Sequence, residues 1–135
     1  MLPLLLGYLA GSVPFAFLLA RRAGVDVRVA GSGNVGAANV LRTAGARRGA
    51  AVMALDVMKG AGAVWLAHSA APGAPVAAVT GAAAIVGHIY PVWLRFHGGK
   101  GVAATAGTGA LILFRHRANL RRLCSGTERR MATRR

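Results

Sequence analysis

Acidic residues are almost absent from this sequence. Asp26, Asp56 and Glu128 are the only three in 135 residues, against 17 Lys and Arg, and the formal net charge is +14. Glycosidase-type catalysis needs two carboxylates flanking one bond. With so few acids spread so far apart, a catalytic carboxylate pair is excluded.

Cysteine is nearly absent as well. The single Cys124 excludes an internal disulfide and a cysteine-based metal site. The sequence shows no sign of a Ser-His-Asp triad either.

Charge of either sign is missing from long stretches. Residues 1–20 carry none, and Gly60 to Leu94 runs for 35 residues without Lys, Arg, Asp or Glu. Spanning helices need about 20 apolar residues. Soluble helices would show polar faces, so the sequence predicts an all-α, polytopic membrane protein with spans at 2–20, 49–67 and 76–94.

The first span has two further features. Gly7 and Gly11 have the spacing that allows close helix packing. A cleaved signal peptide is the rival interpretation, but it requires basic residues before the apolar run. Arg21 and Arg22 follow the run instead.

The basic residues flank the apolar runs. In a soluble protein a charge of +14 would indicate nucleic-acid binding, but this placement is typical of contact with anionic lipid. The positive-inside rule then places the N-terminus outside and the loops 21–48 and 95–101 in the cytoplasm.

A glycine-rich motif lies in the first loop. Residues 31–42 read Gly-Ser-Gly-Asn-Val-Gly-Ala-Ala-Asn-Val-Leu-Arg. Glycines let backbone amides approach an anion, and Arg42 is suited to bidentate phosphate binding. Either this is a phosphate-binding loop, or its polar residues cap a short helix expected at 39–45.

A second cluster of glycines surrounds Lys100. Gly98-Gly99-Lys100-Gly101 resembles a nucleotide P-loop, but Arg95 stands where the pattern needs Gly, and Gly101 where it needs Ser or Thr. Nucleotide binding is rejected, and a phosphate cradle remains.

Three ionisable residues fall inside the predicted spans. Asp56 and Lys59 share one face of the second span at i, i+3, and His88 lies in the third. Charges at membrane depth usually face a partner or a polar cavity. The alternative is that Asp56 and Lys59 are solvated near the cytoplasmic end of their helix.

Together with Arg115 to Glu128, which contains His-x-x-Asn at His116 and Asn119, these motifs resemble the bacterial glycerol-3-phosphate acyltransferases that use acyl phosphate, the PlsY family. The family's Asp-x-x-Lys-Gly run matches Asp56, Lys59 and Gly60, which we interpret as positioning the first loop.

The resemblance implies a phospholipid-synthesis enzyme of the bacterial inner membrane. It would transfer an acyl group from acyl phosphate to glycerol 3-phosphate, giving 1-acylglycerol 3-phosphate, with membrane lipid as its surroundings and no cofactor. Carried over by motif, the catalytic residues would be Ser32, Arg42 and Lys100. The residues implied to bind substrate are Gly31, Gly33, Asn34, Asn39, His88, Gly98, Gly99, Gly101, His116 and Asn119.

The end of the chain departs from that family. Residues 102–114 are 13 apolar residues, about 20 Å as a helix, against a hydrocarbon core of about 30 Å. The basic segment 115–135 follows with a net charge of +7. We therefore predict a membrane domain at 1–114, a re-entrant or interfacial helix at 102–114, and an internal deletion of the family's helices before the third motif. An inactive member, or a cationic membrane-binding protein, is the alternative.

Overall fold

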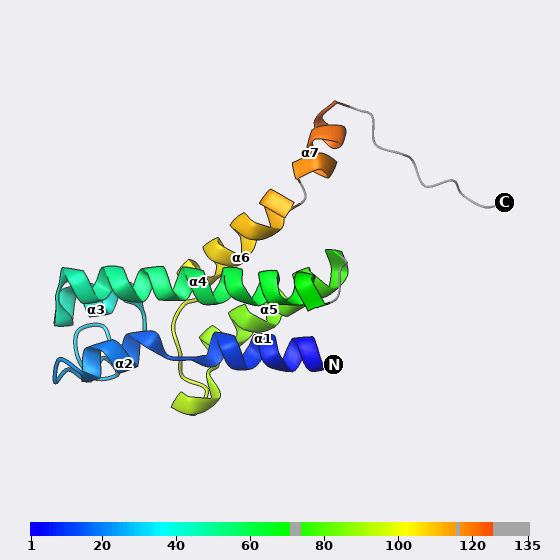
Figure 1. The fold of residues 1–135 in the computed structure, drawn as a ribbon. Helices are drawn as coiled ribbons and strands as arrows, with labels where there is room; N and C mark the ends of the chain where they lie inside the picture. The colour runs from blue at the N-terminus through cyan, green and yellow to red at the C-terminus, as the bar shows by residue number, and fades with distance from the viewer. Residues whose placement is uncertain (71–73, 116, 126–135) are drawn as a thin grey trace.

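The computed structural model describes residues 1–70, 74–115 and 117–125, and every regular element in these ranges is a helix. Three helical segments are long and apolar enough to cross a membrane: Leu2–Arg21, Ala46–Ala70 and Pro75–Leu94. The predicted all-α fold with three spans is confirmed. Figure 1 shows the spans lying side by side.

The first span is interrupted in its middle. Helix α1 (Leu2–Ser12) ends before Val13, and α2 (Phe15–Arg21) continues nearly in line with it after Pro14. Proline has no N–H to donate to the preceding turn, and its ring clashes with that turn. The chain is therefore non-helical at Val13 and Pro14, in the middle of the bundle.

The first loop closes against the start of the second span. It contains the short helix α3 (Ala37–Ala44), which begins two residues earlier than predicted, and α4 (Ala46–Ala70) follows directly. A small apolar core joins this loop to α2 and α4; its members are Ala16, Ala20, Val27, Val35, Val40, Ala44 and Val52.

Helix α5 (Ala74–Ile89) ends ahead of Pro91, which caps a 3₁₀ turn, η1 (Val92–Leu94). The Pro- and Gly-containing sequence at 71–75 predicts a turn between the second and third spans, and it lies partly outside the described residues. Helix α1 packs on α5 through glycines, as predicted: a Cβ on Gly11 would collide with the backbone of Ala84, and one on Gly7 would lie 2.6 Å from the carbonyl oxygen of Thr80.

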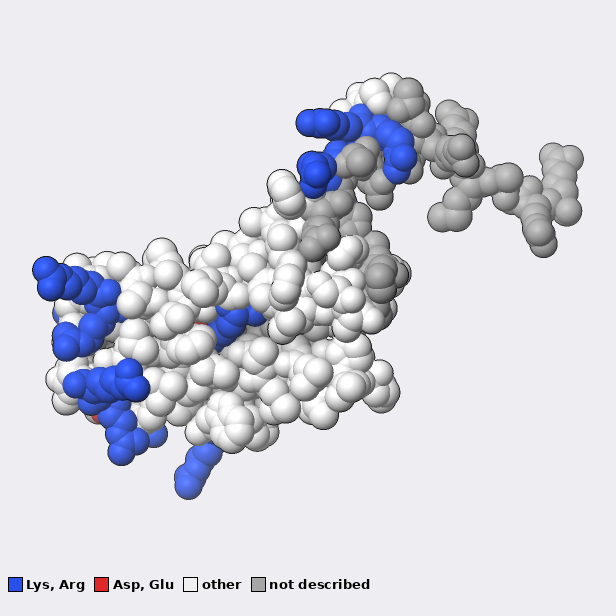
Figure 2. All heavy atoms as spheres, in the orientation of Figure 1, with Lys and Arg blue, Asp and Glu red and all other residues white. Residues whose placement is uncertain are grey.

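Helix α6 (Val102–Arg115) packs on α4 and leads obliquely away from the bundle, and α7 (Arg117–Cys124) continues in that direction (Figure 1). A short apolar helix therefore forms where the sequence predicts one, at 102–114. In Figure 2, the Lys and Arg side chains gather over the end of the bundle that holds α2, α3 and the start of α4, and again on α7.

Candidate functional site

One buried side chain holds the first motif in shape. Asn39, which is fully buried, donates from Nδ2 to the carbonyl oxygens of Val27 (3.1 Å), Ala30 (2.9 Å) and Asn34 (3.0 Å), and its Oδ1 accepts from the Ser32 N–H at 3.0 Å. Asn39 thus fixes the shape of the loop. That it also binds substrate, as the resemblance implies, stays a prediction.

The same loop brings a glycine against this amide. Gly31 has φ +61°, and a Cβ there would collide with Asn39 Oδ1. Glycine is required both for the left-handed conformation and for the close approach. Gly31, Ser32 and Gly33 are exposed, and so is Arg42 at the end of α3.

An exposed ion pair lies in the loop ahead of the motif. Arg28 donates from Nε and Nη2 to the carboxylate of Asp26, at 2.9 and 2.6 Å, and its backbone N–H donates to Asp26 Oδ1 at 3.0 Å. These hydrogen bonds from Arg28 lower the pKa of Asp26 to about 2. The Arg28 guanidinium also stacks on Phe17, 4.8 Å from the ring centre.

The second motif folds back onto the end of α5. The N–H of Gly98 donates to the carbonyl of Ile89 at 3.0 Å, and that of Gly99 to the carbonyl of His88 at 3.2 Å. These two amides are therefore engaged within the fold in this structure, and the phosphate cradle stays a prediction. Arg95 and Phe96 hold φ values of 52° and 64°, a strained conformation for residues with side chains.

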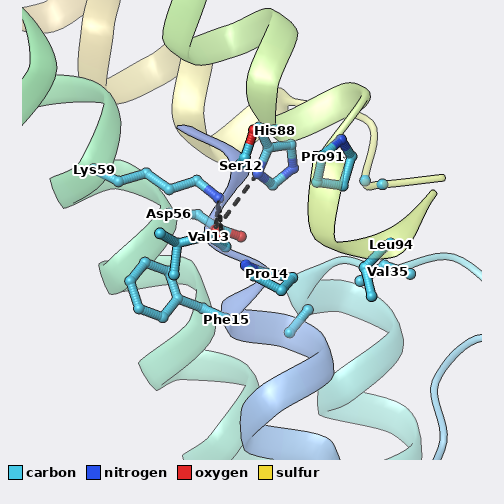
Figure 3. Close-up of a pocket in the computed structure, with 13 residues that line it drawn as sticks. Ser12, Val13, Pro14, Phe15, Val35, Asp56, Lys59, His88, Pro91 and Leu94 are labelled. Carbon is cyan, nitrogen blue, oxygen red and sulfur yellow. Dashed lines mark hydrogen bonds and ion pairs between the residues drawn. The ribbon is translucent and has the colours of Figure 1, made fainter. Parts of the chain in front are cut away.

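A charged cluster lies buried between the spans (Figure 3). Lys59 Nζ is 2.9 Å from Asp56 Oδ1, His88 Nδ1 is 3.5 Å from the same oxygen, and all three side chains are under 8% exposed. The interpretation that Asp56 and Lys59 are merely solvated is wrong. Although two nitrogens face Asp56 Oδ1, neither makes a well-aligned hydrogen bond to it.

The lysine of this cluster contacts the first span. Lys59 Nζ donates to the carbonyl oxygen of Val13 at 2.9 Å and lies 5.5 Å from the centre of the Phe15 ring. The motif predicts that Asp56 and Lys59 position the first loop, whereas the hydrogen bond of Lys59 goes to the break between α1 and α2. The sequence signal for this contact was Pro14 in the middle of an apolar run.

A cavity of about 380 Å³ joins the two motifs. Its polar lining comes from Asn34 of the first motif, Asp56, His88, and Lys100 of the second motif. Apolar residues of α3, α4 and α6 form most of the remaining wall, among them Met53, Val57, Val102 and Ala106. The site is thus polar at the loops and at Asp56 and His88, and apolar along the rest of α4 and along α6.

The structure gathers only part of the predicted site. Asn34, His88, Lys100 and Gly101 line the cavity, and Gly99 lies against the His88 ring. Within the described residues, the lining does not include Ser32 or Arg42.

The described part of the third motif lies apart from the two loops. His116 is outside the described residues, and Asn119 is in α7, which Figure 1 shows leading away from the two loops. That Asn119 binds substrate stays a prediction, and in this structure its helix is not next to Lys100. The physical reason is that α6 has only 14 residues and runs outward from Lys100, so it does not bring the chain back to the loops.

Comparison with known proteins identifies what these motifs resemble. The family described as "Glycerol-3-phosphate acyltransferase" matches residues 1–110. A glycerol-3-phosphate acyltransferase of Myxococcus xanthus is 59% identical over 105 residues, covering 76% of this chain and 55% of its own. One of Rubrobacter xylanophilus is 54% identical, covering 77% and 52%. The chain therefore spans about half the length of the curated relatives it matches.

A solved structure has the same architecture. The crystal structure of PlsY, an integral membrane glycerol 3-phosphate acyltransferase, in its glycerol 3-phosphate form superposes with a TM-score of 0.70 at 31% identity. The alignment covers 98% of this chain and 95% of that one. Its lysophosphatidic acid form gives a TM-score of 0.72 at 30% identity.

Proposed function

The chain belongs to the glycerol-3-phosphate acyltransferase family, and on that premise we propose that its cavity serves acyl transfer to glycerol 3-phosphate. The hydroxyl oxygen at carbon 1 attacks the carbonyl carbon of an acyl phosphate, the bond from that carbon to the phosphate oxygen breaks, and inorganic phosphate leaves. The hydroxyl proton goes to the departing phosphate. The product is 1-acylglycerol 3-phosphate.

The shape and chemistry of the cavity carry this proposal. Both substrates bear phosphate and one bears a long apolar chain. The cavity offers a lysine and an asparagine at the loops and an apolar wall between α4 and α6. An acyl phosphate with its head at Lys100 and its chain beside Val57 and Ala106 matches that polarity.

Lys100 has the main electrostatic role in this scheme. Its ammonium binds a phosphate as a point charge, and Asn34 offers both donors and an acceptor for a second substrate group. Acyl phosphate is already activated, so binding two phosphates in the right geometry supplies most of the acceleration. Ser32 and Arg42 remain candidates for this task, on the loop that Asn39 fixes.

We place this reaction in the bacterial inner membrane, with both motif loops in the cytoplasm. The support is the gathering of arginines over the end of the bundle that holds α2, α3 and the start of α4 (Figure 2). Positive charge next to spans is retained on the cytoplasmic side.

Product formation from acyl phosphate tests the proposal. Vesicles holding the chain are supplied with labelled glycerol 3-phosphate and either acyl phosphate or acyl-CoA. We expect lysophosphatidic acid from acyl phosphate only, and a loss of roughly 10- to 100-fold in Lys100→Ala, the worth of one charge-assisted contact.

Arg95→Ala is the matched control, because Arg95 is an exposed cation of the same loop outside the cavity lining. Equal turnover in Lys100→Ala and the unaltered chain would remove Lys100 from the site. The proposed activity would be wrong if product formed neither with this chain nor with a version in which the helices predicted to be deleted are inserted after Phe114.

A further inference from the structure

Asp56 lines the cavity, but neither it nor Lys59 is assigned a step in the reaction as proposed. Moving charged groups into a dry interior is costly, and they persist there only when paired. Both side chains are almost completely covered, at 3% and 6% exposure. Because burial of two charges among three spans is costly, we expect the pair to have a function.

The contacts of the pair show what it joins. Lys59 extends from α4 to the Val13 carbonyl, in the break between α1 and α2. Asp56, one helical turn earlier, faces the Nδ1 atom of His88 near the end of α5. Two neighbouring side chains of one helix thus connect to both other spans.

His88 links the Asp56–Lys59 pair to the second loop. Its carbonyl accepts from the Gly99 N–H, and its ring lies so close to Gly99 that a Cβ there would be 2.5 Å from Nε2 and 2.6 Å from the Val35 carbonyl oxygen. Gly99 is therefore packed between the end of α5 and the first motif. The next residue is Lys100, at the cavity.

We infer that Asp56 and Lys59 are positioning residues: through His88 and Gly99 they hold the second loop against the end of α5 and the first motif, and so set the place of Lys100. The position of the second loop can be measured without an assay of catalysis. Its consequence for turnover rests on the proposed function.

Trypsin gives a direct measure, because the loop contains the cleavable bonds after Arg95 and Lys100. The full chain, in detergent micelles, is compared with Asp56→Asn, Lys59→Met and the double variant. In each single variant we expect cleavage at these two bonds to rise roughly 10- to 100-fold, the worth of one charge-assisted contact. Cleavage after Arg21 and Arg22 is the internal reference.

The double variant separates positioning from simple charge balance. Each single variant leaves one buried charge uncompensated and should unfold at a lower temperature. The double variant has no such charge, so its unfolding temperature should recover, but its loop should remain as cleavable as in the single variants. If loop protection recovered together with stability, or if no variant raised loop cleavage, the inference would be overturned.

Two controls complete the comparison. Lys59→Arg keeps the charge and a donor for the Val13 carbonyl and should keep the loop protected. Arg47→Met removes an exposed cation from the same helix and should change nothing at the loop. Loop release by Arg47→Met to the same degree would contradict a role specific to the buried pair.

Binding of acyl phosphate distinguishes the two claims. We expect its dissociation constant to rise roughly 10- to 100-fold in the double variant, by loss of the Lys100 contact. A released loop with unchanged affinity would establish the positioning and overturn the proposed use of Lys100.

Discussion

At the scale of single residues, a buried amide is the centre of the first motif. The Asn39 side chain forms four hydrogen bonds, all to the main chain of the loop before it. Removal of one partner of a buried hydrogen bond leaves the other unsatisfied, at roughly 1–3 kcal/mol. The segment between α2 and α3, which forms no helix or strand, therefore depends strongly on one residue for its shape.

Asn39→Ala should destabilise the protein by about 2–4 kcal/mol, because up to three carbonyls and one N–H lose their partner together. Thermal unfolding in detergent measures this. Asn34→Ala is the matched control: Asn34 lines the cavity, so its replacement should weaken glycerol 3-phosphate binding far more than it lowers the unfolding temperature. Equal stability of the two variants would contradict this role of Asn39.

A second residue-scale prediction concerns pH. Because Arg28 lowers the folded-state pKa of Asp26 from 3.8 to about 2, the stabilisation from the pair is present above pH 3.8 and is lost as the pH falls towards 2. Asp26 should therefore stay ionised at pH 3. Carbon-13 NMR of labelled aspartate is practical, since the chain has only two Asp residues. Arg28→Gln should return the pKa towards 3.8; an unchanged pKa would refute the assignment.

At the scale of elements, small residues set how closely the helices approach. Gly7 and Gly11 admit the backbone of α5 to α1, and Gly60 and Gly107 admit α6 to α4. Helices in lipid gain little from the hydrophobic effect and associate by close packing, for which small residues are needed. The short α6 is held to the bundle in this way.

Two glycines of α4 provide a matched test. A Cβ at Gly60 would collide with the Ala104 carbonyl and lie 2.8 Å from Thr108 Oγ1, whereas one at Gly62 would meet nothing within 4 Å. Gly60→Ala should cost about 1–3 kcal/mol by overpacking, and Gly62→Ala should gain about 0.5–1 kcal/mol of helix propensity. Unfolding temperatures that shift alike would show that α6 is not held at Gly60.

At the scale of the whole molecule, the basic residues indicate an orientation in the membrane. In a Cys124→Ser background, cysteines are placed at Val29 in the first loop, which is 84% exposed, and at Ser69 near the far end of α4. A maleimide that does not cross membranes should label Ser69→Cys in intact spheroplasts, and Val29→Cys only after lysis. Labelling of both from the same side would refute the three-span topology.

The length of the molecule also bears on its activity. The chain spans about half of its curated relatives, and α7 with Asn119 lies apart from the cavity (Figure 1). We expect slow turnover, because a displacement of about 1 Å in a catalytic group can cost about 100-fold. Insertion after Phe114 of the helices that we predict to be deleted should restore it. Equal turnover with and without them would show that they are dispensable.

Much of this protein was determined by sequence alone. Apolar runs of spanning length predict the three helices because the bilayer fixes how much apolar chain a span requires. The glycine spacings and the motif residues indicate the close helix contacts, the loops and the family. The tertiary structure decided the rest. Only packing brings His88 to the Asp56–Lys59 pair, engages the Gly98 and Gly99 amides, and leaves Ser32 and Arg42 outside the cavity lining. These features depend on contacts between segments far apart in the chain, and local residue preferences carry no information about which distant partner a side chain meets.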